Sequence, residues 1–163
     1  MKRLRYIGAA LTLAIGLIAG YEGKENRAYL DIVKVPTICY GTTKDVRLGD
    51  VKTDDECLQL LRAEVVRIDG LITERVHVPL LPHERAAFIS FTYNVGDGAF
   101  IRSTALKRLN KGDTHGACEA LATKTYINGV CQGYGCGWAG GKMVRGLQNR
   151  RLDERAMCLG EKL

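Results

Sequence analysis

Two acidic residues near the N-terminus, Glu22 and Asp31, have the types and the spacing needed to hydrolyse a glycosidic bond. Eight residues separate them, and five more lead from Asp31 to Thr37. Glycoside hydrolysis needs one protonated carboxyl group for the leaving oxygen and a second, ionised one for water or the sugar carbon. The two groups need different environments so that their pKa values separate. The Thr37 hydroxyl could position the water.

The elements that carry these residues decide whether the chemistry is possible. A helix that ends at Glu22 and a strand or turn that carries Asp31 would give the two carboxyl groups different surroundings. The turn-like run Ile-Cys-Tyr-Gly-Thr-Thr then follows at residues 38–43. By residue type alone, however, two acids this close in sequence more often belong to a solvated surface. The pattern around them must therefore carry the assignment.

That pattern resembles the active-site signature of the phage-type lysozymes, the muramidases of glycoside hydrolase family 24. The signature is Glu, eight residues, Asp, five residues, Thr, followed by I-x-Y-G-x-T. Three further segments are similar to this family: residues 84–96, residues 100–113 and the motif Gly-Leu-Gln-Asn-Arg-Arg at 146–151. Together they cover most of residues 21–158. Cys39 stands where the family often has Gly, and Thr42 where it often has His, so the local strand is expected to differ.

The resemblance implies an enzyme and a mechanism. It implies an endolysin that hydrolyses the β-1,4 bond between N-acetylmuramic acid and N-acetylglucosamine in peptidoglycan during phage-induced host lysis. Glu22 would be the general acid, Asp31 and Thr37 would handle water, and the anomeric centre would be inverted without a cofactor or metal. The alternatives are a lytic transglycosylase, which uses one Glu and makes an anhydro product, and a non-enzymatic wall-binding or holin-like protein. The presence of Asp31 and Thr37 at the spacing of the signature argues against a transglycosylase. The paired-acid signature argues against a non-enzymatic protein.

The expected fold is α+β and mostly α, with two lysozyme-like lobes and a cleft between them. A length of 163 residues suits one domain or two small lobes that share a core. We expect a small β region around residues 33–52. A helix should start at a capping box of Thr53 and Glu56, and a buried central helix at Glu84. Shorter helices are expected at 103–110 and 116–124, an irregular glycine-rich stretch at 126–141, and a last helix at 146–158, where Arg150, Arg151 and Arg155 would form a solvated face.

The first 20 residues read as a membrane segment. A basic block at residues 2–5 precedes the uncharged run from Tyr6 to Gly20. A cleaved signal peptide is one interpretation, but the run lacks an A-x-A exit, and cleavage there would fall two residues from Glu22. We favour an uncleaved anchor over residues 1–20, followed by a catalytic domain over 21–163. Fifteen helical residues span about 22 Å, less than the ~30 Å hydrocarbon core, so this anchor could leave the membrane.

Combined with the resemblance, this segment implies a signal-anchor-release endolysin. The host Sec machinery would export the protein. The N-terminus would stay in the cytoplasm because of the positive block, with the enzyme on the periplasmic face of the inner membrane until release into the periplasm. The run from Tyr6 to Gly20 contains no cysteine, and Asp31 is not replaced by one. Activation by thiol exchange therefore finds no support in the sequence.

The remaining features concern cysteines, histidines and charge. Six cysteines in a short chain favour an oxidising compartment. The short spacing suggests a Cys131–Cys136 pair, and the family-like layout implies Cys118–Cys158 and Cys39–Cys57.

The three histidines are scattered, which argues against zinc. The net charge of +6 suits an anionic polymer such as the cell wall. The dispersed Lys and Arg residues match no nucleic-acid module, and we expect a monomer.

Overall fold

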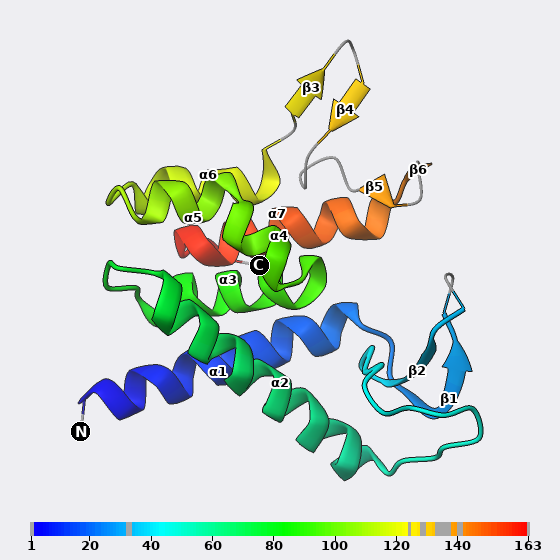
Figure 1. The fold of residues 1–163 in the computed structure, drawn as a ribbon. Helices are drawn as coiled ribbons and strands as arrows, with labels where there is room; N and C mark the ends of the chain where they lie inside the picture. Colours follow the sequence, from blue (N-terminus) through cyan, green and yellow to red (C-terminus); the bar gives the residue numbers. More distant parts are fainter. Residues whose placement is uncertain are drawn as a thin grey trace.

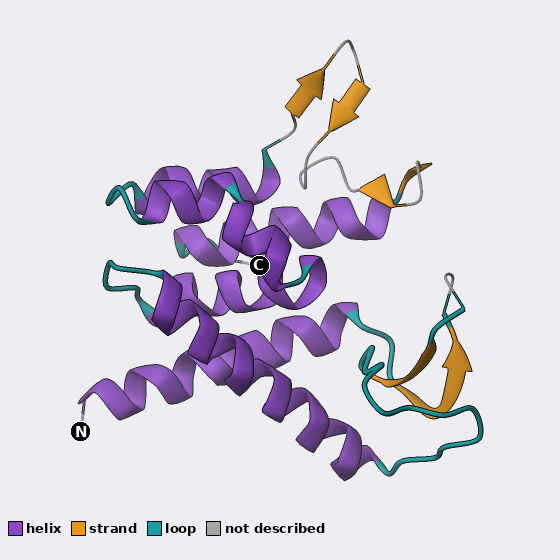
Figure 2. Ribbon diagram, viewed as in Figure 1, coloured by secondary structure: helices purple, strands orange, loops and turns teal. Residues whose placement is uncertain are grey.

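The computed structural model describes residues 2–31, 34–123, 125–127, 130–132, 138–139 and 142–162, with side chains at 7–31, 34–123 and 144–162. Helices dominate the described chain, and the strands form three antiparallel hairpins (Figures 1 and 2). The helices are α1 (Lys2–Tyr21), α2 (Asp54–Arg75), α3 (Pro82–Val95), α4 (Asp97–Arg102), α5 (Thr104–Leu109), α6 (Thr114–Ala122) and α7 (Arg145–Leu159). The hairpins are β1 (Glu25–Leu30) with β2 (Pro36–Cys39), β3 (Thr125–Ile127) with β4 (Val130–Gln132), and β5 (Trp138–Ala139) with β6 (Lys142–Met143).

Two apolar clusters account for the two-lobed architecture. The larger cluster joins residues of all seven helices, α1 to α7, and the smaller one consists of Ala28, Ile38, Cys39 and Cys57. Helix α2 takes part in both, because Cys57 lies in the small cluster and the residues from Leu61 onward lie in the large one. The predicted α+β and mostly α architecture with a small β region is therefore confirmed.

Helix α1 covers the segment that we expected to be a membrane anchor. Ala10, Ala14 and Ile18 recur every fourth residue, so they share one face of the helix, and all three are fully buried. This face packs beside the central helix α3 (Figure 1). Gly8, Gly16 and Gly20 lie on the exposed side, where an added Cβ atom would meet nothing within 4 Å. Across the described chain, every helix is too short or too polar to cross a membrane.

The starts of α2 and α3 follow from local capping. The predicted capping box is present, since the Thr53 hydroxyl accepts from Glu56 N at 3.2 Å and the Glu56 carboxylate accepts from Thr53 N at 2.7 Å. Pro82 opens α3, and the Glu84 carboxylate accepts from Leu81 N at 2.6 Å. Residues 86–92 of α3 are buried without interruption, so this helix is the predicted centre of the large lobe.

Three expectations about local structure need correction. The β region begins at Glu25 rather than near residue 33, and most of residues 40–52 form loop with isolated bridges such as Arg27 to Val51. Helix α4 was not among the helices predicted from the sequence, because Gly96 is a residue type that commonly ends a helix. Its backbone, at φ 83°, instead turns the chain directly into a new helix. The stretch predicted to be irregular contains hairpins β3–β4 and β5–β6.

Two of the three expected disulfides are confirmed. Cys39–Cys57 joins the end of β2 to the first turns of α2, and Cys118–Cys158 joins α6 to α7. Cys39 has a left-handed backbone with φ 61°, which explains why the resembling family often has Gly there. The strain of order 1–3 kcal/mol is offset by a disulfide that typically contributes about 2–4 kcal/mol. The predicted Cys131–Cys136 pair lies outside the residues whose side chains are described.

Candidate active site

Glu22 lies where α1 ends, as the sequence predicts. Its backbone N–H donates to Ile18 O at 2.8 Å, and its side chain is 26% exposed. Oxygen Oε1 accepts a charge-assisted hydrogen bond from Arg150 Nη1 on α7. Oxygen Oε2 faces Gly41, where an added Cβ atom would lie 3.8 Å away. The carboxylate is therefore held between α7 and the segment that follows β2.

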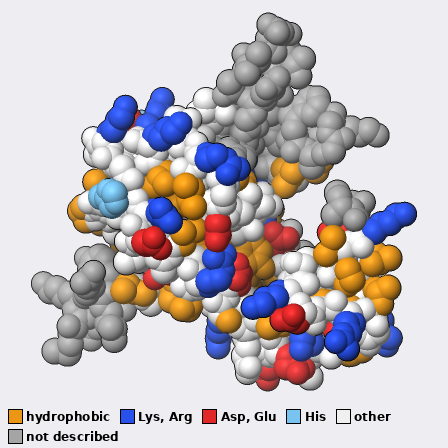
Figure 3. Space-filling view, in the orientation of Figure 1, with side chains coloured by type: hydrophobic (Ala, Val, Ile, Leu, Met, Phe, Trp, Pro, Cys, Tyr) orange, Lys and Arg blue, Asp and Glu red, His pale blue; other side chains and the backbone are white. Residues whose placement is uncertain are grey.

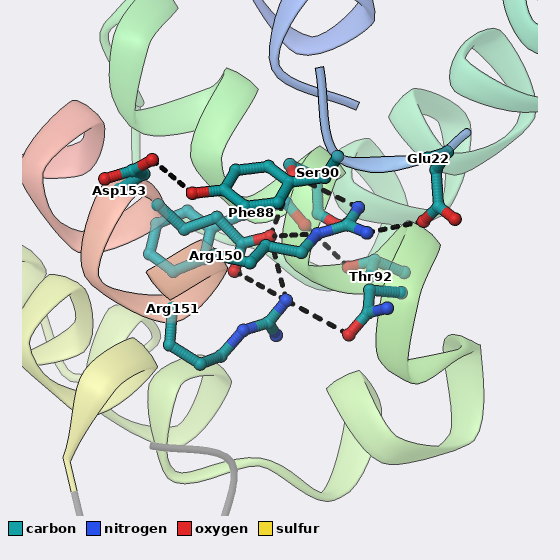
Figure 4. A network of polar contacts seen from close by, with 10 residues as sticks. Glu22, Phe88, Ser90, Thr92, Arg150, Arg151 and Asp153 are labelled. Atoms are coloured by element: carbon teal, nitrogen blue, oxygen red, sulfur yellow. Dashed lines mark hydrogen bonds and ion pairs between the residues drawn. The ribbon is translucent and has the colours of Figure 1, made fainter. Parts of the chain in front are cut away.

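Arg150 is buried and binds three groups at once (Figure 4). Besides Glu22, its Nε donates to Glu154 Oε1 at 3.1 Å and its Nη2 donates to Ser90 O at 3.3 Å. The guanidinium carbon lies 5.7 Å from the centre of the Tyr21 ring, a cation–π distance. These contacts fix the guanidinium from α1, α3 and α7 together.

Glu154 lies behind Arg150 and is fully buried. Its Oε1 also accepts from Ser90 Oγ at 2.8 Å and from Arg151 Nη2 at 3.0 Å. Arg151 Nη2 in turn reaches Asn94 Oδ1 at 3.1 Å. Burial raises the pKa of Glu154, and the two guanidiniums and the Ser90 hydrogen bond act in the opposite direction. We call Glu22, Ser90, Arg150, Arg151 and Glu154 the acid-holding cluster.

This arrangement corrects the expected solvated arginine face of the last helix. Arg150 and Arg151 are each 2% exposed, whereas Arg155 is partly exposed and pairs with Glu119 at 2.7 Å. The sequence signal that could have revealed the burial is Glu154 itself, three and four residues after the two arginines. This spacing places all three charges on one helix face, where they can enter a core as a neutralised group.

Two tyrosines pack around Glu22. Tyr21 donates its hydroxyl to the Asp153 carboxylate on α7. Tyr93 of α3 donates its hydroxyl to Tyr40 O at 2.5 Å. Burial, together with the nearby charges of Glu22 and Glu64, raises the pKa of Tyr93, so the phenol keeps its proton and remains a donor.

Asp31 and Thr37 lie on the β1–β2 hairpin rather than at the end of α1. Both side chains form hydrogen bonds with the backbone of Val35. Asp31 Oδ1 accepts from Val35 N at 2.8 Å, and the Thr37 hydroxyl donates to Val35 O at 3.0 Å. Thr37 pairs with Tyr29 across the hairpin and is 4% exposed. The two side chains are therefore linked through Val35.

A cavity of 630 Å³ lies beside this site, but Glu22, Asp31 and Thr37 are not among its lining residues. The lining residues lie on the loop after β2, on α2 and on α3, and they include Gly41, Lys44, Lys52, Glu64, Arg67 and Tyr93. Gly41 is thus shared between the cavity and Glu22. The printed hydrogen bonds of Asp31 and Thr37 stay within the hairpin, whereas Glu22 borders the cavity through Gly41. Across the described side chains, no group of three or more His, Cys, Asp or Glu residues could hold a metal.

Comparison with known proteins agrees with the fold. The family model for phage lysozyme matches residues 19–154. The SAR-endolysin of Pseudomonas phage phiKMV is 40% identical over 155 residues, which cover 93% of this chain and 89% of that protein. The SAR-endolysin of bacteriophage PS119 is 38% identical over 159 residues, with 93% and 88% covered. The solved endolysin from Escherichia coli O157:H7 phage FAHEc1 is 32% identical, with a TM-score of 0.73 and 90% of each chain covered.

The chain belongs to the phage lysozyme family. It is therefore a glycosidase of the muramidase class, and its substrate is peptidoglycan.

Proposed function

We propose that this enzyme cleaves the β-1,4 bond between N-acetylmuramic acid and N-acetylglucosamine with inversion, using Glu22 as the general acid and Asp31 with Thr37 on the water side. The observation that carries this proposal is the asymmetric setting of Glu22. Its Oε1 is occupied by Arg150, while Oε2 faces Gly41. Oε2 is thus the oxygen that would carry the proton to the glycosidic oxygen.

The hairpin supports the proposed role of Asp31 and Thr37. Both side chains form hydrogen bonds with the backbone of Val35, so the turn fixes their positions relative to each other. A carboxylate in this position could take the proton of an attacking water while Glu22 protonates the opposite side of the bond. The Thr37 hydroxyl donates to Val35 O, so its lone pairs are the part that would accept a hydrogen from the water.

Substitutions that keep the turn intact test this assignment. Asp31→Asn retains an acceptor for Val35 N but loses the charge, so it should lower peptidoglycan hydrolysis by about 10²- to 10⁴-fold. Asp31→Ala should lose most activity as well, and should also weaken the turn. Thr37→Val keeps the shape and removes the hydroxyl, and it should reduce activity by no more than Asp31→Asn does. Initial rates on purified peptidoglycan provide the measurement.

The control is Asp55→Asn, which removes an exposed carboxylate from the first turn of α2. It should retain full activity. If Asp31→Asn hydrolysed the wall at the wild-type rate, Asp31 would have no part in activating water. A single-acid mechanism around Glu22 would then be favoured.

We further propose that the enzyme acts in host lysis as a signal-anchor-release endolysin, the name given to the relatives above. The Sec machinery would export it with residues 1–20 in the inner membrane and the N-terminus in the cytoplasm. Residues 21–163 would be the catalytic domain on the periplasmic face. Release would let Ala10, Ala14 and Ile18 pack as they do in this structure. The two disulfides suit an oxidising periplasm.

The surface supports this setting. Lys and Arg side chains are dispersed over the visible face and are mixed with acidic ones (Figure 3). A net charge of +6 spread in this way would attract an anionic wall without forming a single docking patch. We propose that the released enzyme works as a monomer on glycan strands.

A further inference from the structure

We propose that Glu154 is a positioning residue for hydrolysis, because it holds Arg150 in the orientation that fixes one oxygen of Glu22 and leaves the other for proton transfer. This inference rests on the proposed role of Glu22 as the general acid. Glu154 is fully buried, so it cannot touch the substrate and can act only through its neighbours.

The chain of contacts from Glu154 to Glu22 is short and continuous (Figure 4). Glu154 Oε1 receives Arg150 Nε at 3.1 Å, and the opposite side of the same guanidinium donates Nη1 to Glu22 Oε1. A guanidinium is planar and rigid, so fixing Nε also fixes the direction of Nη1. Ser90 supports both partners, since its hydroxyl donates to Glu154 at 2.8 Å and its carbonyl accepts from Arg150 at 3.3 Å.

The charges of the cluster support the same role. When all four groups are ionised, the negative charges of Glu22 and Glu154 balance the positive charges of Arg150 and Arg151, so the charge of the acid-holding cluster sums to zero. Each oxygen of Glu154 lies within 3.1 Å of a guanidinium nitrogen, which is the geometry of an ion pair. A neutral residue at this position would leave a surplus positive charge in a buried region. An unbalanced charge there interacts more strongly than it would in water.

A surplus positive charge has a predictable consequence for Glu22. It favours the ionised carboxylate, whereas a general acid must be protonated to act. The alkaline limb of the pH–rate profile should therefore move to lower pH. Tyr93 on α3 lies near Glu22, and burial together with the charges of Glu22 and of Glu64 on α2 raises its pKa, so it keeps its proton. Tyr21 on α1 contacts Arg150, and burial and Asp153 raise its pKa. Asp153 on α7 is bound to the Tyr21 hydroxyl.

The test is Glu154→Gln in the full chain. The amide keeps the size of the side chain but turns one of its ends into a donor that faces Arg151. We expect kcat on purified peptidoglycan to fall by roughly 10²-fold, the cost of misplacing a reacting group by about 1 Å. KM should be unchanged, and the alkaline limb should shift to lower pH. Thermal unfolding of the same preparation shows whether the variant is folded.

The matched control is Glu119→Gln, which removes the ion pair between α6 and Arg155, the residue of α7 directly after Glu154. It should leave kcat and the pH profile unchanged. The comparison then shows whether an effect of Glu154→Gln comes from the position of Arg150 or from the loss of any ion pair on α7. If Glu154→Gln does not fold, the kinetics of Ser90→Ala test the positioning role instead. This variant loses the hydroxyl that supports Glu154 and should lower kcat by roughly tenfold at constant KM.

The failure of this inference can be told from the failure of the proposed function. A folded Glu154→Gln enzyme with wild-type kcat and pH profile would overturn the positioning role, and so would an unchanged Ser90→Ala enzyme if the first variant is unfolded. Neither result would affect the assignment of Glu22. That assignment depends on Glu22→Gln, which is measured in the same assay.

Discussion

Glu22→Gln is expected to lower peptidoglycan hydrolysis by about 10²- to 10⁴-fold, because an amide cannot give the leaving oxygen the proton it requires. The structure makes this a clean substitution. Glutamine has the size of glutamate, and its carbonyl oxygen can still accept from Arg150 where Glu22 Oε1 does now. The folded state should therefore survive, and binding to the wall should be retained while turnover is lost.

Glu25→Gln is the matched control, since Glu25 is an exposed carboxylate three residues further along the chain. It should hydrolyse the wall normally. Sedimentation with insoluble peptidoglycan measures binding, and release of soluble fragments measures turnover. A Glu22→Gln enzyme with near wild-type turnover would end the assignment of Glu22 as the acid.

The second large effect concerns release from the membrane. Gly8→Leu, Gly16→Leu and Gly20→Leu together should keep the protein in the membrane pellet and delay or prevent lysis, even after depolarisation. A leucine at the centre of a membrane helix contributes about −0.3 to −0.6 kcal/mol, so three leucines add at most roughly −1 to −2 kcal/mol of insertion free energy to this weakly apolar segment. All three glycines are exposed on α1, and an added Cβ atom meets nothing within 4 Å. The packed face of α1 is left intact, so a loss of lysis would reflect retention rather than misfolding.

Serine at the same three positions is the control, because it adds side chains without adding apolar surface. That variant should fractionate and lyse as the wild type does. The purified leucine variant should also remain active on isolated peptidoglycan. If the leucine variant stayed in the membrane and still lysed cells on the wild-type schedule, release would not be the switch.

Local signals in the sequence were sufficient for much of the fold. The capping box at Thr53 and Glu56 fixed the start of α2, since both of its hydrogen bonds form within four residues. The buried residues of the same helix, Cys57, Leu61, Val65, Ile68 and Ile72, recur at the spacing of one helix face. Helix α4 was not predicted because Gly96 commonly ends a helix. In the structure Gly96, at φ 83°, is followed directly by α4, and Phe100 of this helix packs in the core.

The candidate site was predictable only in part. The signature predicted Glu22, Asp31 and Thr37 as the catalytic residues through a family pattern rather than through their chemistry, and these roles stay a prediction. The partners of Glu22 were missed, because an arginine on a helix is usually solvated and the contact with Arg150 joins residues 128 positions apart. The spacing of Glu154 from the two arginines was visible in the sequence, but its contact with Ser90 depends on the packing of α3 against α7.

The configuration of the first product tests the central claim most directly. Proton NMR of a glycan digest, recorded before mutarotation, shows whether the new reducing end is the α or the β anomer. With Glu22 as acid and Asp31 activating water on the opposite face, a β-1,4 bond should give the α anomer first. A β anomer would contradict inversion, and a 1,6-anhydro end without a reducing sugar would show a transglycosylase that does not use Asp31 to activate water.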